Sequence, residues 1–117
     1  SLHDALPIWS RIGYTRKFSE TFDVSMAVKS DVTVIALRDR GRGQKLFLNT
    51  AGNSGLATAG SGDVLAGVIA SLMAQGNTPD ISLMYGVMIH SKAAEKYATD
   101  SASKRKMMAG DIIDNLF

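Results

Sequence analysis

The chain of 117 residues has no cysteine, only two prolines and few aromatic residues, which make up 7% of it. Without cysteine it has no disulfide framework and no thiolate for a metal ion or a substrate. The net charge of +2 is too small to indicate a nucleic-acid partner. The longest apolar stretch, residues 64–74, is too short to span a bilayer. We therefore expect a soluble, cytoplasmic protein that binds neither nucleic acid nor a membrane.

The chain is long enough for one small domain. Hydrophobic residues make up 45% of it, which suffices for a core. Residues 1–8 match the in-frame translation of a common sequencing adapter, so we expect them to be an artefact that precedes a domain over residues 9–117. Neither histidine indicates a metal site. His3 falls in the adapter-like segment, and His90 has no second ligand one helical turn away, so we expect His90 to be a hydrogen-bonded core residue.

Strand signals dominate the first half of the chain. A helix is predicted to end at residues 18–22, followed by a short strand at 24–28. The β-branched run at 32–37 and the partly alternating run at 44–49 indicate two strands, and residues 38–43 between them indicate a hairpin loop. The sequence therefore predicts a small piece of sheet here.

Helix signals dominate the second half. Residues 64–75 are apolar on nearly every face and end before Gly76, which predicts a helix buried in the interior. Thr78 and Pro79 indicate the N-cap and first position of a helix over 79–99, and a last helix opens near residue 110. The buried stripe of the long helix is predicted to be Ile81, Met84, Val87, Met88 and Ala94.

The most informative segment is residues 49–67, which hold five of the eleven glycines. Glycine lets backbone N–H groups approach a phosphate closely, and the first turn of a helix carries unpaired N–H donors. Asp63 directly follows Gly60, Ser61 and Gly62. A carboxylate at this place can be the general base for a hydroxyl that attacks a phosphoryl group. It can equally be a residue that complements the helix dipole. The residues alone leave both roles open.

Residues 53–67, which read Asn-Ser-Gly-Leu-Ala-Thr-Ala-Gly-Ser-Gly-Asp-Val-Leu-Ala-Gly, resemble the signature of the ADP- or ATP-dependent NAD(P)H-hydrate dehydratases. That family belongs to the ribokinase-like superfamily. Residues 28–35 resemble the family's strand-turn-strand segment, and the resemblance covers about residues 16–117. It implies an α/β fold of the ribokinase-like three-layer α/β/α type, of which only the C-terminal part is expected here.

The resemblance also implies the roles of individual residues. Asp63 would be the catalytic base and would contact the substrate hydroxyl. Ser30 departs from the glycine that the family often has. Without the resemblance, Lys29 and Asp31 would be an ordinary exposed pair in a turn, worth well under about 1 kcal/mol. The nucleotide would be bound by Lys29, Ser30, Asp31, Val32, Thr33, Asn53, Gly60, Ser61 and Gly62.

As the resemblance implies, the terminal phosphate of ADP or ATP passes to the ring hydroxyl of hydrated NADH or NADPH (NADHX or NADPHX). Elimination of phosphate then restores the cofactor. With ADP, which we predict as the co-substrate, the products are NAD(P)H, AMP and phosphate. Mg²⁺ is expected because the nucleotide arrives chelated, and the intact enzyme is expected to be a homo-oligomer. The alternatives are a ribokinase-like small-molecule kinase and an inactive fragment.

Overall fold

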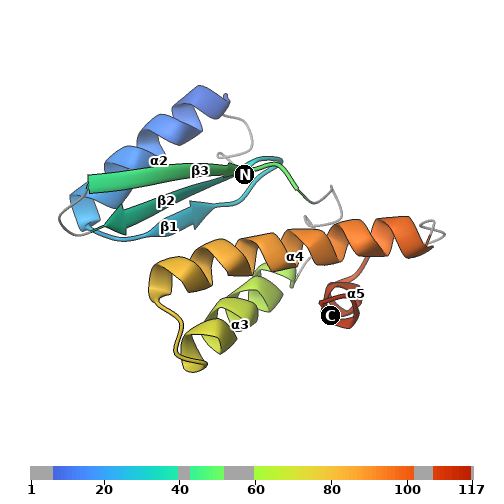
Figure 1. Cartoon of the computed structure of the whole chain (residues 1–117). Helices are drawn as coiled ribbons and strands as arrows, with labels where there is room; N and C mark the ends of the chain where they lie inside the picture. The colour runs from blue at the N-terminus through green and yellow to red at the C-terminus, as the bar shows by residue number, and fades with distance from the viewer. Residues whose placement is uncertain (1–6, 40–42, 52–59, 102–106, 117) are drawn as a thin grey trace. The chain divides into compact units, whose positions relative to one another are not determined.

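The computed structural model describes residues 7–39, 43–51, 60–101 and 107–116 (Figure 1). The chain divides into two compact units, residues 1–50 and 51–117, and each is described by itself. Within the described residues the first unit holds a helix and three strands, and the second holds three helices. Their bounds are α2 Ile8–Phe22, β1 Met26–Val28, β2 Thr33–Asp39, β3 Gly43–Asn49, α3 Ser61–Ala74, α4 Pro79–Ser101 and α5 Ala109–Asp114.

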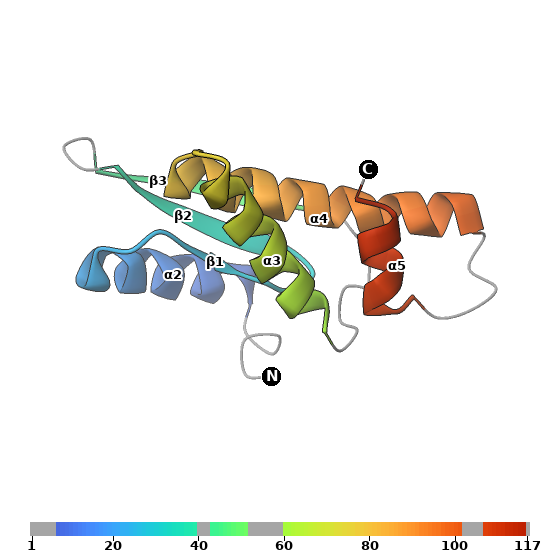
Figure 2. The ribbon, with the colours of Figure 1, turned by 90° about the horizontal axis from the view of Figure 1, so that it is seen from below.

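The three predicted strands are present, and they form an antiparallel sheet in the order β1-β2-β3. Val34 pairs with Val28 on one side and with Leu48 on the other, so β2 is the central strand. The side chains of residues 34–37 are buried, and α2 packs mainly on this strand (Figure 2). The predicted hairpin joins β2 to β3, and its tip at residues 40–42 lies outside the described residues.

Helix α2 packs on the sheet through polar residues. Arg11, Thr15 and Ser19 follow one another at one-turn spacing and are all buried. The Thr15 hydroxyl donates to the Arg11 carbonyl at 2.6 Å, and the Ser19 hydroxyl donates to the Val24 carbonyl at 2.6 Å. These local hydrogen bonds allow the hydroxyl groups to be buried without a large cost. The helix ends at Phe22, within the predicted segment.

The second unit is built from α3, α4 and α5. Helix α3 packs against α4, and α5 contacts both (Figure 2). The core cluster forms where the C-terminal half of α4 meets α5 and the segment before it. Val64 and Leu116 pack against this cluster from its edge. The buried members of the cluster are Ala93, Ala94, Tyr97, Met107 and Ile112.

The C-terminal end of α3 and the start of α4 follow the sequence signals, whereas α3 begins at Ser61, three residues before the predicted start. Gly76 has a φ of +95° and its N–H donates to the Met73 carbonyl at 3.0 Å, which stops α3 where predicted. The Thr78 hydroxyl accepts from the Ile81 N–H at 3.3 Å, which confirms Thr78 as the N-cap of α4. No helix in the described part of the chain is long and apolar enough to cross a membrane.

The predicted burial of α3 is wrong for this chain. Among its residues only Ser61 and Leu65 are buried, and Met73 is 46% exposed. A helix that is apolar all round needs neighbours on every side to be buried, and in the second unit α4 and α5 cover only part of it. An apolar face of α3 therefore stays open.

Candidate active site

Helix α3 begins with a glycine in the left-handed conformation. Gly60 is its N-cap, with φ +87° and ψ −9°, and its carbonyl accepts the first helical hydrogen bond, from Val64 N–H at 3.1 Å. A Cβ at Gly60 would lie 3.3 Å from Ala109 Cβ at the start of α5. Both the positive φ and this close approach favour glycine at position 60. Gly62 lies inside α3 in ordinary helical conformation, so the left-handed residue of the turn is Gly60.

The first turn of α3 presents backbone donors and one carboxylate. The first N–H groups of a helix have no partner within that helix, and glycine at the N-cap offers no side chain to take them. These groups, together with the helix dipole, favour an anion at this end. Asp63 is exposed in the same turn, as the acidic residue of the first turn. The arrangement can hold a phosphoryl group on amides while an exposed carboxylate accepts a proton beside it.

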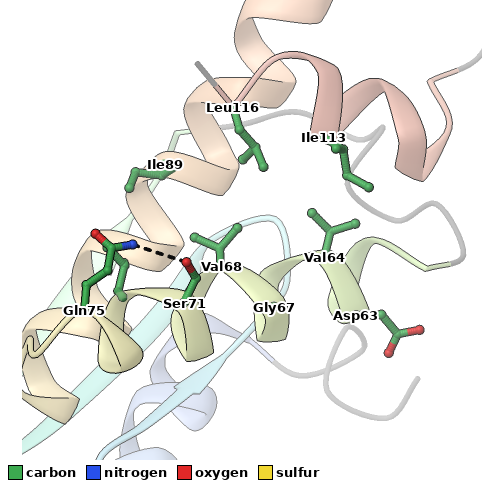
Figure 3. A pocket seen from close by; sticks show the side chains of 10 residues that line it. Asp63, Val64, Gly67, Val68, Ser71, Gln75, Ile89, Ile113 and Leu116 are labelled. Atoms are coloured by element: carbon green, nitrogen blue, oxygen red, sulfur yellow. Dashed lines mark hydrogen bonds between the residues drawn. The ribbon is translucent and has the colours of Figure 1, made fainter.

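Asp63 also lies at one end of a pocket of about 620 Å³ between α3, α4 and α5 (Figure 3). Its walls are mostly aliphatic, and its polar side chains apart from Asp63 are Ser71 and Gln75, which hydrogen-bond to each other at 3.2 Å. Such a lining suits an apolar group and not a phosphate. The aliphatic residues of the wall are Val64, Val68, Leu72, Ile89, Ile113 and Leu116.

His90 is bonded to the start of α3. Its Nε2 atom lies 2.9 Å from the carbonyl oxygen of Ser61, and the two residues are 2% and 4% exposed. This confirms the sequence prediction of a hydrogen-bonded core histidine. Over the described ranges of the chain, no three His, Asp or Glu residues gather in a way that could hold a metal ion.

Of the other predicted nucleotide-binding residues, Lys29 to Val32 form the turn between β1 and β2 of the first unit, and Thr33 is the first residue of β2. Sequence reasoning missed the residue that holds this turn. Buried Arg11 donates to the Val32 carbonyl at 3.1 Å and to Asp31 Oδ1 at 3.0 Å. In the sequence Arg11 is one charged residue of a helix, and this alone does not predict its contacts with the turn.

Asp31 therefore pairs with Arg11, and the exposed Lys29–Asp31 pair considered from the sequence is wrong. The Val32 backbone N–H and the Ser30 hydroxyl, with the Arg11 guanidinium, hold the pKa of Asp31 below its usual value. Lys29 is half-buried, and burial lowers the pKa of its ammonium group. We find no carboxylate paired with Lys29 among the described residues, so an anionic ligand would suit it.

The structure thus places the predicted residues in two groups. Gly60, Ser61, Gly62 and Asp63 lie at the start of α3 in the second unit, and residues 29–33 lie at the turn between β1 and β2 of the first unit. Asn53 lies outside the described residues.

The family model for NAD(P)H-hydrate dehydratase matches residues 2–116. The chain belongs to this family. A bifunctional NAD(P)H-hydrate repair enzyme of Moorella thermoacetica is 40% identical over 106 residues, which are 91% of this chain and 19% of that protein. The ADP-dependent (S)-NAD(P)H-hydrate dehydratase of Neisseria meningitidis is 35% identical over 102 residues, which are 87% of this chain and 33% of that protein. The chain therefore spans a third or less of these dehydratase relatives.

Solved structures match the fold of this chain. The Bacillus subtilis protein YxkO matches with a TM-score of 0.80 and 28% identity, over 96% of this chain and 41% of that one. The B. subtilis ADP/ATP-dependent NAD(P)H-hydrate dehydratase, co-crystallised with ATP and Mg²⁺, matches with a TM-score of 0.78 and 29% identity, over 91% of this chain and 36% of that one. The predicted ribokinase-like α/β fold is confirmed, with part of the dehydratase fold present.

Proposed function

We propose that the protein carrying this sequence is an ADP-dependent (S)-NAD(P)H-hydrate dehydratase that repairs NADHX and NADPHX. The observation that carries the proposal is the first turn of α3, where exposed Asp63 follows the left-handed Gly60 at a helix N-terminus, in a chain of this family. The name of the Neisseria relative, which is ADP-dependent, supports the choice of ADP.

The proposed reaction has two steps. In the first, the oxygen of the substrate's ring hydroxyl attacks the terminal phosphorus of ADP, and AMP leaves. Asp63 takes the proton of that hydroxyl during the attack. In the second, the C–O bond breaks and the phosphate departs with that oxygen, so that loss of a ring proton restores the dihydronicotinamide. The amides around Gly60, Ser61 and Gly62 would hold the phosphoryl oxygens, whose charge rises during the transfer.

The turn between β1 and β2 would bind the nucleotide. We propose that Lys29 contacts the nucleotide, because a half-buried ammonium group without a paired carboxylate in the described residues gains from an anion. Ser30, Asp31, Val32 and Thr33 would contact the nucleotide beside it, and Asn53 would do so from the glycine-rich segment. Arg11 fixes the path of this turn through Val32 and Asp31.

Mg²⁺ fits this scheme as an ion carried by the nucleotide. Mg²⁺ keeps several waters and takes phosphate oxygens, with few ligands from the protein. The ion would neutralise phosphate charge, and we assign it no protein ligand. The B. subtilis enzyme co-crystallised with ATP and Mg²⁺ supports this choice of ion. A homo-oligomer and a cytoplasmic location remain proposals.

The proposal is tested with the full-length protein that carries these residues, hydrated NADH, Mg²⁺ and either ADP or ATP. We expect NADH, recorded by its absorbance, to be regained together with one equivalent each of AMP and phosphate, and ADP to be the better co-substrate. A phosphorylated product that accumulates without recovery of NADH would instead show a small-molecule kinase. A clear preference for ATP would overturn the choice of ADP.

A further inference from the structure

Helices α3 and α4 approach closely along a face of α4 that carries small and polar residues. A Cβ at Gly86 would lie 2.6 Å from Ile69 Cγ1, so glycine is what permits this approach. His90 lies four residues further along α4, on the same face. Gly86 thus meets the middle of α3, and His90 meets its first residue, Ser61. These two contacts fix α3 against α4 at two levels.

The direction of the hydrogen bond between His90 and Ser61 follows from its chemistry. A carbonyl oxygen can only accept, so Nε2 of His90 carries the proton and donates it over the 2.9 Å to Ser61 O. The oxygen has two lone pairs, which lets it accept from His90 as well as within the helix. Because both residues are buried, water does not compete for this bond.

The Ser61 carbonyl and the Gly62 N–H belong to the same planar peptide group. In a trans peptide these two groups point in opposite directions, so fixing the carbonyl also fixes the direction of the N–H. A hydrogen bond donated to the carbonyl also polarises the peptide and strengthens its N–H as a donor. Asp63 is the next residue, so its backbone is set by the same anchor. Ala109 of α5 lies next to Gly60, at the start of this turn.

We propose that His90 is a positioning residue for phosphoryl transfer. It acts through the Ser61 carbonyl, aims the Gly62 N–H at the transferred phosphoryl group and holds Asp63 beside it. The inference rests on the proposed function. It gives His90, a core residue of α4 that contacts neither substrate nor nucleotide, a role in positioning the groups that do.

Two variants of similar polarity separate positioning from packing. Glutamine can place its amide nitrogen near the position of histidine Nε2 and donate there, whereas asparagine is too short to reach Ser61. We expect His90→Asn to lower kcat by about tenfold or more with a smaller change in KM for ADP, because small displacements of reacting groups are costly. We expect His90→Gln to stay within about threefold of the wild type. Val87→Ala, which truncates a buried residue of α4, is the control for lost stability.

The measurements are kcat, KM and thermal unfolding of the full-length protein and its variants. The proposal fails if His90→Gln is as impaired as His90→Asn, or if Val87→Ala lowers kcat as much as His90→Asn at equal loss of melting temperature. Nitrogen NMR of the wild-type protein gives a test that needs no variant, since an unprotonated Nε2 on His90 would also overturn the proposal. Wild-type turnover of hydrated NADH tests the function separately. If the wild type phosphorylates another alcohol, the kcat values of His90→Gln and His90→Asn are compared for that reaction in the same way.

Discussion

Replacement of Asp63 by asparagine is expected to lower turnover of hydrated NADH by about 100-fold or more, the usual scale for loss of a general base. Asparagine has nearly the same shape but cannot take the hydroxyl proton. Because Asp63 is exposed, the free energy of unfolding should change by no more than about 0.5 kcal/mol. Steady-state turnover and thermal unfolding of the full-length protein measure the two quantities.

Asp80→Asn is the matched control, because Asp80 is the acidic residue in the first turn of α4. Both substitutions remove one carboxylate from the first turn of a helix, so both weaken an interaction with the helix dipole. If Asp63 only complements the dipole, both variants will keep full turnover. That outcome would remove Asp63 from the reaction.

Gly62→Val is expected to weaken binding of AMP by about tenfold or more while it lowers the melting temperature only slightly. A branched side chain in the first turn would obstruct the phosphate, and losing a hydrogen bond to a charged group costs about 1.5–3 kcal/mol. Since Gly62 is helical, its substitution does not strain the backbone. Gly60 is the less informative position, because its positive φ and the nearby Ala109 penalise any side chain for structural reasons. Calorimetric titration with AMP measures the affinity.

Gly67→Val provides the control for the Gly62 variant. Gly67 lies in the same helix, a Cβ there meets nothing within 4 Å, and the cost of valine in a helix is the same. We expect Gly67→Val to bind AMP as the wild type does. Equal affinities of the Gly62 and Gly67 variants, both folded, would contradict a phosphate site at this turn.

Local signals in the sequence predicted the elements of the fold well. The β-branched run of residues 32–37 became the central strand β2, because such side chains suit a buried strand. Gly76 and Thr78 marked the end of α3 and the start of α4, since left-handed glycine and a capping hydroxyl act within a few residues of chain. Signals of this kind need no knowledge of distant contacts.

The buried face of α4 was predicted only in part. Val87 and Ala94 are buried as expected, but Ile81 is 41% exposed and Met88 is 37% exposed. The face turned inward also contains Gly86, which was missed because close helix packing favours a small residue over an apolar one. Hydropathy alone cannot reveal which face another helix approaches.

The sequence likewise predicted some residues of the candidate site and missed others. Gly60 to Asp63 could be predicted because one short motif encodes a helix N-terminus together with its carboxylate. The supports of the site could not, because they are long-range contacts. His90 bonds to a residue 29 positions earlier, and Arg11 bonds to Asp31, 20 positions later. Only folding brings these pairs together, and no single-sequence pattern marks them.

The central claim is that the substrate's ring hydroxyl is phosphorylated and then leaves as phosphate. Hydrated NADH prepared in isotopically labelled water carries the label on that hydroxyl oxygen. Turnover with ADP in ordinary water, followed by phosphorus NMR of the released phosphate, shows where this oxygen goes. The account predicts that each phosphate released carries one labelled oxygen, because the bond from carbon to oxygen breaks after phosphorylation. Unlabelled phosphate, with the label recovered in water, would contradict it.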